Sequence, residues 1–240
     1  MGSWTQALWS ALWPPRCLLC AELLTGEERG FCPPCLATLA PVAEPICRVC
    51  GRELLKGSAP EDLVCGFCRR DPPAFDRARA FGRYQGMLAE SIRALKFRSV
   101  RKLAPGLAAF MLAADTALVG ELALDAVIPV PLHPARIRQR GFNQAVDLAR
   151  PLARRRRLPL LFSTLVRTRD TAPQYGLTFE QRRRNIRGAF AVPRPAEVAE
   201  KRLLLVDDVL TTGATIGECA RVLKKAGAAE VVVLTLARAG

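Results

Sequence analysis

The sequence predicts an α/β protein in which a small cysteine-rich module precedes a domain built on a parallel β-sheet. Eight of the nine cysteines form four Cys-x-x-Cys pairs within the first 70 of the 240 residues. The last 40 residues read strand, helix, strand, and both strands are continuous apolar runs, a pattern typical of parallel strands covered on both faces. We expect an N-terminal helix over 1–15, the cysteine module over 16–70 and the sheet domain over 74–240.

Composition excludes several classes of protein. Hydrophobic residues make up 50% of the chain and charged residues 24%, which is the balance of a folded globular protein. No apolar run approaches the roughly 18 residues that a membrane span needs, and the N-terminus lacks the basic start and cleavage site of a secretory signal. We therefore expect a cytoplasmic protein without a membrane span.

The positive charge is concentrated in one part of the chain. The formal net charge is +14, and residues 131–200 contain 15 Arg, no Lys and only five acidic residues. Such an excess favours anionic partners, either phosphates on a small molecule or a nucleic-acid backbone. The alternative, which applies especially to the arginine run 154–157, is a solvated arginine-rich surface without a ligand.

The paired cysteines predict structural zinc. Each Cys-x-x-Cys turn directs two thiolates the same way, and two such turns complete a tetrahedral site without an open position. A disulfide framework would require export, for which the sequence has no signal. The pairs could join sequentially, as two zinc ribbons, or interleave in a cross-braced arrangement. Cys219, on an expected helix, suits a small buried residue. The expected ligands are Cys17, Cys20, Cys32, Cys35, Cys47, Cys50, Cys65 and Cys68.

The first half of the chain contains two helical stretches around one expected strand. Trp4, Trp9 and Trp13 lie on a helix that ends at Pro14-Pro15, where they would dock a partner or pack on the cysteine module. Asp71-Pro72-Pro73 indicates a linker. Hydrophobic spacing then predicts a strand over 78–84 and a helix over 87–115 with a break near Pro105.

The second half alternates strands with helices, interrupted by one polar segment. Residues 168–185 are rich in Arg and lack an apolar period, so we expect a long surface loop there. Apolar runs, helical spacing and a terminating Gly227 define the remaining elements. In chain order these are strand 125–131, helix 143–150, strand 188–192, strand 202–206, helix 214–226 and strand 230–236.

The most informative stretch covers residues 203–215, Leu-Leu-Leu-Val-Asp-Asp-Val-Leu-Thr-Thr-Gly-Ala-Thr. A buried parallel strand carries Asp207 and Asp208 to its carboxyl end, where α/β sheets bind ligands. The following loop contains three threonines and Gly213 and opens into a helix, whose N-terminus favours a phosphate. Because two carboxylates repel phosphate, they suit ribose hydroxyls, an oxocarbenium-like transition state or a bridging divalent ion.

The stretch 203–215 has two other interpretations besides a phosphate site. Leu-Leu-Leu-Val-Asp-Asp could be the second nucleotide motif of an ATPase, but the chain has no Gly-x-x-x-x-Gly-Lys-Ser/Thr loop to accompany it. It could also be an ordinary strand followed by a threonine N-cap. The full thirteen-residue pattern favours a phosphate site over both.

The stretch 203–215 resembles the phosphoribosyl-pyrophosphate (PRPP) signature of type I phosphoribosyltransferases. Together with the cysteine pairs, it is similar to the ComF family of ComFC- and GntX-like proteins, which is linked to DNA uptake and natural transformation. The resemblance spans nearly the whole chain and implies a type I phosphoribosyltransferase-like parallel sheet behind a double zinc ribbon. Further matches are Pro129-Val130-Pro131-Leu132-His133, Arg136, Arg140-Gly141-Phe142-Asn143-Gln144, Gln174, Arg183-x-Asn185 and Gly188-Ala189-Phe190.

The resemblance also implies roles for particular residues. Asp207 and Asp208 would be catalytic and contact the ribose or its Mg²⁺. Many relatives have Gly near Ser99, which places the role of the neighbouring Lys96 in question, and each Arg could instead be a surface ion pair. The loop residues implied for the 5′-phosphate are Thr211, Thr212, Gly213, Ala214 and Thr215, and the cations implied for pyrophosphate are Lys96, Arg136 and Arg140.

Two polar residues of the second half of the chain have alternative roles. His133 is the only histidine of the chain, and a helix cap or a core position suits it better than a general base, because displacement at the anomeric carbon depends on charge stabilisation. Asn143, with Gln144, could cap a helix or form a hydrogen-bonding hood over the ligand.

Three functions follow. The first is Mg²⁺-dependent phosphoribosyl transfer from PRPP, with 168–185 as a lid that excludes water. The second is a non-catalytic PRPP sensor. The third is a protein that handles single-stranded DNA among the DNA-uptake proteins. Its aromatic residues are too scattered for base stacking, so phosphate contacts with a steep salt dependence would dominate.

Overall fold

A computed structural model describes residues 14–24, 30–55, 57, 63–172, 176 and 178–240. The expected tryptophan-bearing helix and Gln174 lie outside these residues.

The centre of the molecule is a four-stranded parallel sheet in the order β1-β6-β5-β2. The register pairs Val206 of β5 with Leu234 of β6, both fully buried. The parallel sheet expected from unalternated apolar strands is therefore confirmed. Its strands are β1 (Arg77–Arg83), β2 (Ala126–Pro129), β5 (Arg202–Leu210) and β6 (Glu230–Arg238).

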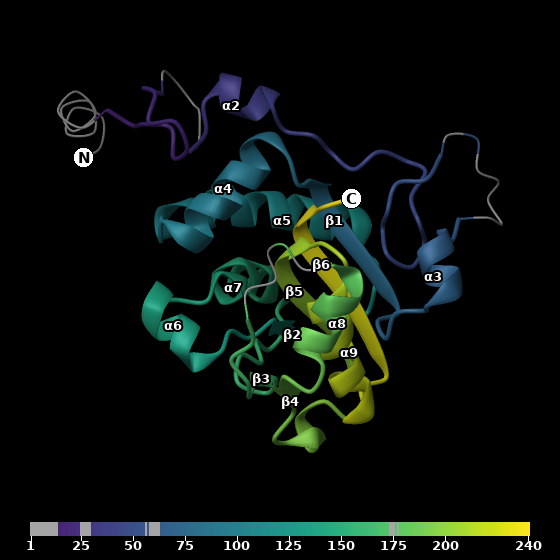
Figure 1. The fold of residues 1–240 in the computed structure, drawn as a ribbon. Helices are drawn as coiled ribbons and strands as arrows, with labels where there is room; N and C mark the ends of the chain where they lie inside the picture. The colour runs from purple at the N-terminus through teal and green to yellow at the C-terminus, as the bar shows by residue number, and fades with distance from the viewer. Residues whose placement is uncertain (1–13, 25–29, 56, 58–62, 173–175, 177) are drawn as a thin grey trace.

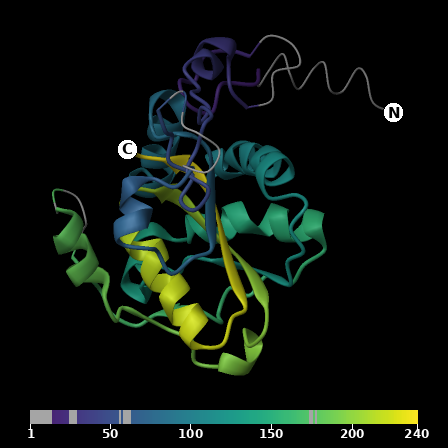
Figure 2. The ribbon, with the colours of Figure 1, turned by 90° about the vertical axis from the view of Figure 1, so that its right-hand side faces the viewer.

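Helices cover both faces of this sheet, which explains why its strands are apolar on both sides (Figures 1 and 2). Leu204 and Val206 face one core, whereas Leu203 and Leu205 face the other. The four longest helices of the described residues pack into these cores, three into the first and one into the second. They are α4 (Gly86–Phe97), α5 (Ala104–Leu118) and α7 (Gln144–Arg156) on one side, and α9 (Ala214–Lys225) on the other.

The remaining elements are short and lie in the connections. β3 pairs antiparallel with β4, which packs against α9. The bounds are α2 (Pro33–Ala37), α3 (Gly66–Arg70), the 3₁₀ turns η2 (Arg101–Leu103) and η3 (Pro195–Glu197), α6 (Pro134–Arg140), α8 (Phe179–Ile186), β3 (Val166–Arg167) and β4 (Phe190–Ala191).

One expectation is confirmed and one was wrong. The helical stretch 87–115 is interrupted near Pro105, as expected: α4 ends at Phe97, Ser99 has the left-handed φ of 52°, and Pro105 occupies the first turn of α5. Proline is tolerated in a first turn because the N–H groups there have no partner within the helix. The expected loop 168–185 contains α8, which begins with a reciprocal capping box between Thr178 and Gln181.

The cysteine module is attached to the edge of the sheet by backbone hydrogen bonds. Ala78 N–H of β1 donates to the Val49 carbonyl at 2.6 Å, and Arg83 N–H donates to the Ala40 carbonyl at 2.7 Å. In Figure 1 this module, in purple and blue, extends along α4 and β1. The module therefore covers the edge strand β1, which would otherwise expose unpaired backbone groups.

Membrane insertion finds no support in the described part of the chain, where each helix is too short or too polar to cross a bilayer.

Candidate functional site

The stretch 203–215 forms β5, a short loop and the start of α9, as its sequence predicts. Asp207 and Asp208 lie near the carboxyl end of β5. Gly213 has a φ of 80°, a left-handed conformation that glycine adopts readily, and Ala214 N–H donates to Thr212 Oγ1 at 3.4 Å. A Cβ added at Gly213 would meet nothing closer than 3.8 Å, so the glycine is required by backbone conformation and leaves open space beside the loop.

A buried ion pair joins Lys96 to Asp208 within the site. Lys96 Nζ lies 2.7 Å from Asp208 Oδ1, and the Asp208 side chain is 2% exposed. Burial acts to lower the pKa of Lys96, but the charges of Asp208 and Asp207 outweigh it, so its pKa is raised and the ammonium stays charged. The second carboxylate oxygen, Asp208 Oδ2, is buried and has no hydrogen-bond partner among the described residues.

Asp207 has a different environment from its neighbour. Its Oδ1 accepts a hydrogen bond from Asp208 N–H at 2.9 Å. Burial, and next the charge of Asp208, raise the pKa of Asp207 to about 7, although Lys96 and Arg167 act in the opposite direction. The site therefore combines one ion-paired carboxylate with one that is close to its titration point at neutral pH.

The two arginines expected to meet pyrophosphate lie on α6, in different surroundings. Burial lowers the pKa of Arg140, while the charges of Asp208 and Asp207 act to raise it, so this guanidinium lies within electrostatic range of both carboxylates. Its Nη1 donates to Gln144 Oε1 at 2.5 Å. Arg136 is directed instead toward the segment after β3, where its Nη2 donates to the Thr171 carbonyl at 3.0 Å.

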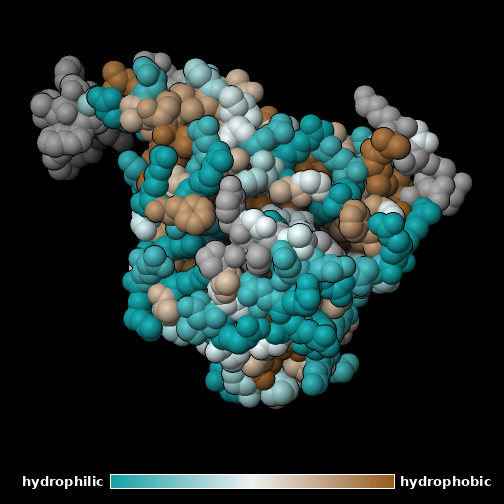
Figure 3. All heavy atoms as spheres, viewed as in Figure 1, coloured by the Kyte–Doolittle hydropathy of each residue, from teal (hydrophilic) through white to brown (hydrophobic). Residues whose placement is uncertain are grey.

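Two further arginines belong to this region and were not singled out from the sequence. Arg167 of β3 donates to Thr171 Oγ1 and lies close enough to Asp207 to affect its pKa. Arg182 of α8 donates to Thr211 Oγ1 in the loop at 3.5 Å. Both belong to a chain segment with so many arginines that spacing alone does not distinguish them. Figure 3 shows that the surface over α6 and α8 is predominantly hydrophilic.

His133 and Asn143 act as helix caps. His133 Nδ1 accepts from Ala135 N–H at 3.3 Å at the start of α6, and Asn143 Oδ1 accepts from Ala145 N–H at 3.0 Å at the start of α7. The capping interpretation is confirmed for both residues. Cys219 is fully buried, as expected for a small apolar residue of α9.

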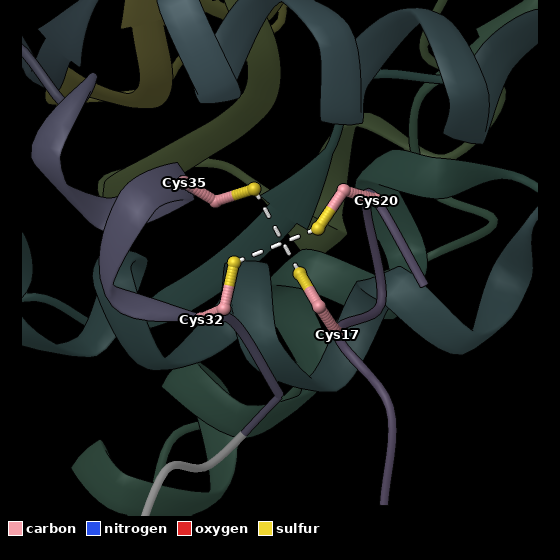
Figure 4. Close-up of side chains that lie close together, drawn as sticks. All are labelled: Cys17, Cys20, Cys32 and Cys35. Carbon is pink, nitrogen blue, oxygen red and sulfur yellow. Dashed lines mark hydrogen bonds between the residues drawn. The ribbon is translucent and has the colours of Figure 1, made fainter. Parts of the chain in front are cut away.

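The eight paired cysteines form two compact quartets. In each, the sulfur atoms lie within 4.8 Å of one another. Figure 4 shows the four sulfurs of the first quartet directed at a common centre, with Cys17 Sγ 3.8 Å from Cys35 Sγ and Cys20 Sγ 3.5 Å from Cys32 Sγ. Tetrahedral zinc with Zn–S bonds of about 2.3 Å needs sulfurs about 3.8 Å apart. The quartets fit zinc, and they are Cys17, Cys20, Cys32 and Cys35, followed by Cys47, Cys50, Cys65 and Cys68.

This grouping selects the sequential arrangement over the cross-braced one. All nine cysteines are free of disulfide bonds. Although burial acts to raise it, backbone N–H groups lower the pKa of Cys47 to about 7, and Cys65 N–H donates to its Sγ at 3.3 Å. Four-thiolate sites of this kind have no open coordination position, so the zinc they bind is structural.

Comparison with known proteins agrees with this organisation. The Double zinc ribbon domain family matches residues 8–69, and the Phosphoribosyl transferase domain family matches residues 137–240. Competence protein F of Haemophilus influenzae is 34% identical over 228 residues, which cover 93% of this chain and 97% of that protein. DNA utilization protein YhgH of Escherichia coli O157:H7 is 34% identical over 94% of this chain and 97% of its own length.

A more distant relative has the same extent. Competence protein ComFC of Bacillus subtilis is 26% identical over 246 residues, covering 92% of this chain and 94% of that protein. The described sheet, the two cysteine quartets and this end-to-end similarity agree with one another. The chain therefore belongs to the ComF family, in which a double zinc ribbon precedes a phosphoribosyltransferase-type domain.

Proposed function

We propose that this protein binds PRPP with Mg²⁺ at the β5–α9 site and acts in DNA uptake, and that the site is suited to phosphoribosyl transfer. One observation carries the proposal. Asp208 Oδ2 is buried without a partner in the described residues, two residues before the end of β5, and the loop after this strand opens into α9. A buried unpaired carboxylate oxygen is costly unless a ligand completes it, and ribose hydroxyls are donors of the right kind.

The loop and helix would hold the 5′-phosphate. The first N–H groups of a helix have no acceptor within the helix, and the helix dipole favours a negative group there. Thr211, Thr212 and Thr215 add hydroxyl donors, while Gly213 and Ala214 present backbone without bulk. Lys96 helps because its ion pair with Asp208 cancels a charge that would otherwise repel the phosphates.

The cations around the carboxylates would serve the pyrophosphate. Arg140 lies within electrostatic range of Asp207 and Asp208. Arg136 lies close enough to Arg140 to lower the pKa of Arg140 further. Mg²⁺ prefers oxygen ligands and usually keeps substrate phosphates and waters among them. The ionised carboxylate of Asp207 would supply one further oxygen ligand. When bound, the ion would neutralise the charge that develops on the departing pyrophosphate.

The same carboxylates would stabilise positive charge at the anomeric carbon as its bond to pyrophosphate breaks. Exclusion of water would fall to the segment 168–185, in which Arg182 of α8 already reaches Thr211 of the loop. Eight thiolates that must stay reduced to hold zinc favour the cytoplasm as the setting. If transfer does not occur, the same site would serve as a PRPP sensor.

The role in DNA uptake rests on the relatives, which are a competence protein and a DNA utilization protein. Direct handling of single-stranded DNA is a second candidate, favoured by the arginines that α6 and α8 place beside the site. Phosphate contacts of this kind would make affinity fall steeply with salt. Replacing Arg183 and Arg184 by Gln should make the dependence of DNA affinity on salt shallower by about two phosphate contacts if they contact DNA, with proteins of the uptake machinery as further partners.

The carboxylates are tested by a double substitution. Asp207→Asn with Asp208→Asn should abolish PRPP binding in calorimetric titration while the fold is retained, because both ribose acceptors lose their charge. Asp147→Asn, on α7, is the control and should bind normally. An unchanged affinity in the folded double variant would refute the assignment of these residues to the ribose.

The phosphate loop is tested separately. Thr211→Ala with Thr215→Ala should weaken ribose 5-phosphate and PRPP by a similar factor, because both share the 5′-phosphate. If only PRPP binding suffers, the loop binds pyrophosphate and the ligand lies in the opposite orientation.

A further inference from the structure

The second zinc quartet is touched by a cation from the far end of the chain. Arg238, the last residue of β6, is 8% exposed. Its Nη1 donates to the Cys50 carbonyl at 2.8 Å, and its Nη2 lies 3.6 Å from Cys50 Sγ, within the range of an N–H···S hydrogen bond. A residue of the sheet domain therefore reaches a zinc ligand of the ribbon module.

This contact matters because of the charge of the centre. Four thiolates around Zn²⁺ leave a net charge of −2, and all four cysteines of this quartet are buried. A buried anion without a counter-charge is strongly unfavourable, and so is a buried guanidinium alone. The single positive charge of Arg238 offsets half of the charge of the centre. Groups outside the ligand shell that bond to a metal ligand commonly change metal affinity.

The first quartet has no equivalent in the described part of the chain. There, no Lys or Arg side chain donates a hydrogen bond to Cys17, Cys20, Cys32 or Cys35. Cys20 is exposed, whereas the second quartet is buried throughout. Two sites with the same ligands thus differ in solvent access and in counter-charge.

The backbone of Arg238 is held by the sheet, and only its side chain contacts the ribbon. Its register partner on β5 is Leu210, and its carbonyl accepts from Tyr84 N–H at 2.7 Å. When the ribbon loosens, the guanidinium of Arg238 therefore stays at the sheet, because its backbone is part of β6.

We propose that Arg238 is the outer counter-charge of the second zinc centre and fixes that centre to the sheet domain. The second zinc is therefore released much more slowly than the first. The contact also makes the C-terminal strand part of the zinc module, although the two are at opposite ends of the sequence.

The test measures zinc release from the full-length, zinc-loaded protein. Excess chelator with a colorimetric zinc indicator should give a fast and a slow phase of one zinc each. N-ethylmaleimide trapping with peptide mass spectrometry assigns the phases by showing which cysteines become free. The fast phase should label Cys17–Cys35 and the slow phase Cys47–Cys68.

The variant Arg238→Gln should accelerate the slow phase about 10- to 100-fold and leave the fast phase unchanged. Arg83→Gln is the matched control, since Arg83 contacts the same ribbon through Glu53 without touching a sulfur, and both phases should match the wild type. A folded Arg238→Gln protein with an unchanged slow phase would overturn the proposal. If Arg238→Gln does not fold, Arg238→Lys is the alternative test. This variant keeps the positive charge and should therefore keep the slow phase. Loss of the slow phase in a folded Arg238→Lys protein would equally overturn the proposal.

Discussion

Asp207 and Asp208 are neighbours in sequence but have different partners, and this difference shapes the candidate site. Lys96 Nζ lies 2.7 Å from Asp208 Oδ1, while the Asp207 carboxylate accepts a hydrogen bond from the N–H of Asp208 at 2.9 Å. A buried ion pair contributes little net stability, yet removing one member leaves an uncompensated charge. The arrangement therefore favours a site prepared for a ligand over a site that maximises stability.

Replacement of Lys96 should show that cost. Lys96→Met is expected to lower the free energy of unfolding by about 3–5 kcal/mol, because Asp208 stays buried without a counter-charge. Adding Asp208→Asn should recover much of the loss. Urea unfolding measures both, with Arg93→Gln as an exposed control on the same helix that should change stability by less than about 0.5 kcal/mol. A Lys96→Met protein as stable as this control would contradict the buried ion pair.

The raised pKa of Asp207 predicts that the stability of the fold depends on pH. Its pKa rises from 3.8 to about 7 on folding, so the folded state favours the protonated form. The stability from this group is complete below pH 3.8 and is lost as pH rises through 7. The free energy of unfolding of Asp207→Asn, relative to that of the wild type, should therefore increase by about 1 kcal/mol as the pH rises from 6 to 8.5. Denaturant curves at several pH values measure the difference, and parallel profiles for the two proteins would show that the carboxyl is ionised normally.

Among the elements, α4 joins the sheet domain to the first zinc ribbon through a close backbone contact. Gly86 begins α4 with a φ of 51°, and a Cβ there would lie 2.2 Å from the Thr38 carbonyl oxygen. The next residue, Met87, donates its N–H to Thr38 Oγ1 at 3.0 Å. Glycine is required at this position by both conformation and space.

The expected consequence is a large cost for Gly86→Ala. Left-handed backbone and a steric clash together should lower the free energy of unfolding by about 2–4 kcal/mol. Gly141→Ala is the matched control, because Gly141 has a φ of 84° with nothing near the added Cβ, and it should lose only the conformational part. If thermal or denaturant unfolding shows that the two variants lose the same free energy of unfolding, the backbone at Thr38 moves away from the added Cβ without an energetic cost.

The elements also show what the sequence could predict. β5, α9 and β6 were located almost correctly, because buried parallel strands are continuously apolar and Gly227 ends the helix. α8 was missed, since its sequence is almost entirely polar and its start depends on a capping box. The zinc ligands followed from spacing alone, but the meeting of Lys96 with Asp208 depends on where α4 ends, which no local pattern specifies. Arg167 was missed because its strand is two residues long.

In the whole molecule, the two zinc ribbons and the sheet form one connected structure. The first quartet packs into the core that contains α4, α5 and α7, and the second into the core that contains α9. The module is thus bound to both faces of the sheet as well as to the edge of β1. Its zinc should stabilise the sheet domain as well as the ribbons.

Zinc removal should therefore affect β1. Chelation at neutral pH is expected to unfold residues 17–68 first and then to expose the amides of Ala78 and Arg83, which donate to ribbon carbonyls. Hydrogen exchange with mass spectrometry measures this order, with β5 amides as the internal reference. A metal-free protein with full protection in 17–68 would contradict structural zinc.

Binding of PRPP with Mg²⁺ at the β5–α9 site is the proposal on which the other roles depend, and calorimetric titration of the full-length protein is its most direct test. PRPP is titrated with and without Mg²⁺, and ribose 5-phosphate is the control ligand. We expect Mg²⁺-dependent binding of PRPP that is clearly tighter than binding of ribose 5-phosphate. Absence of binding under every condition would contradict the claim, and would leave the arginines of α6 and α8 as the basis of a DNA-handling role.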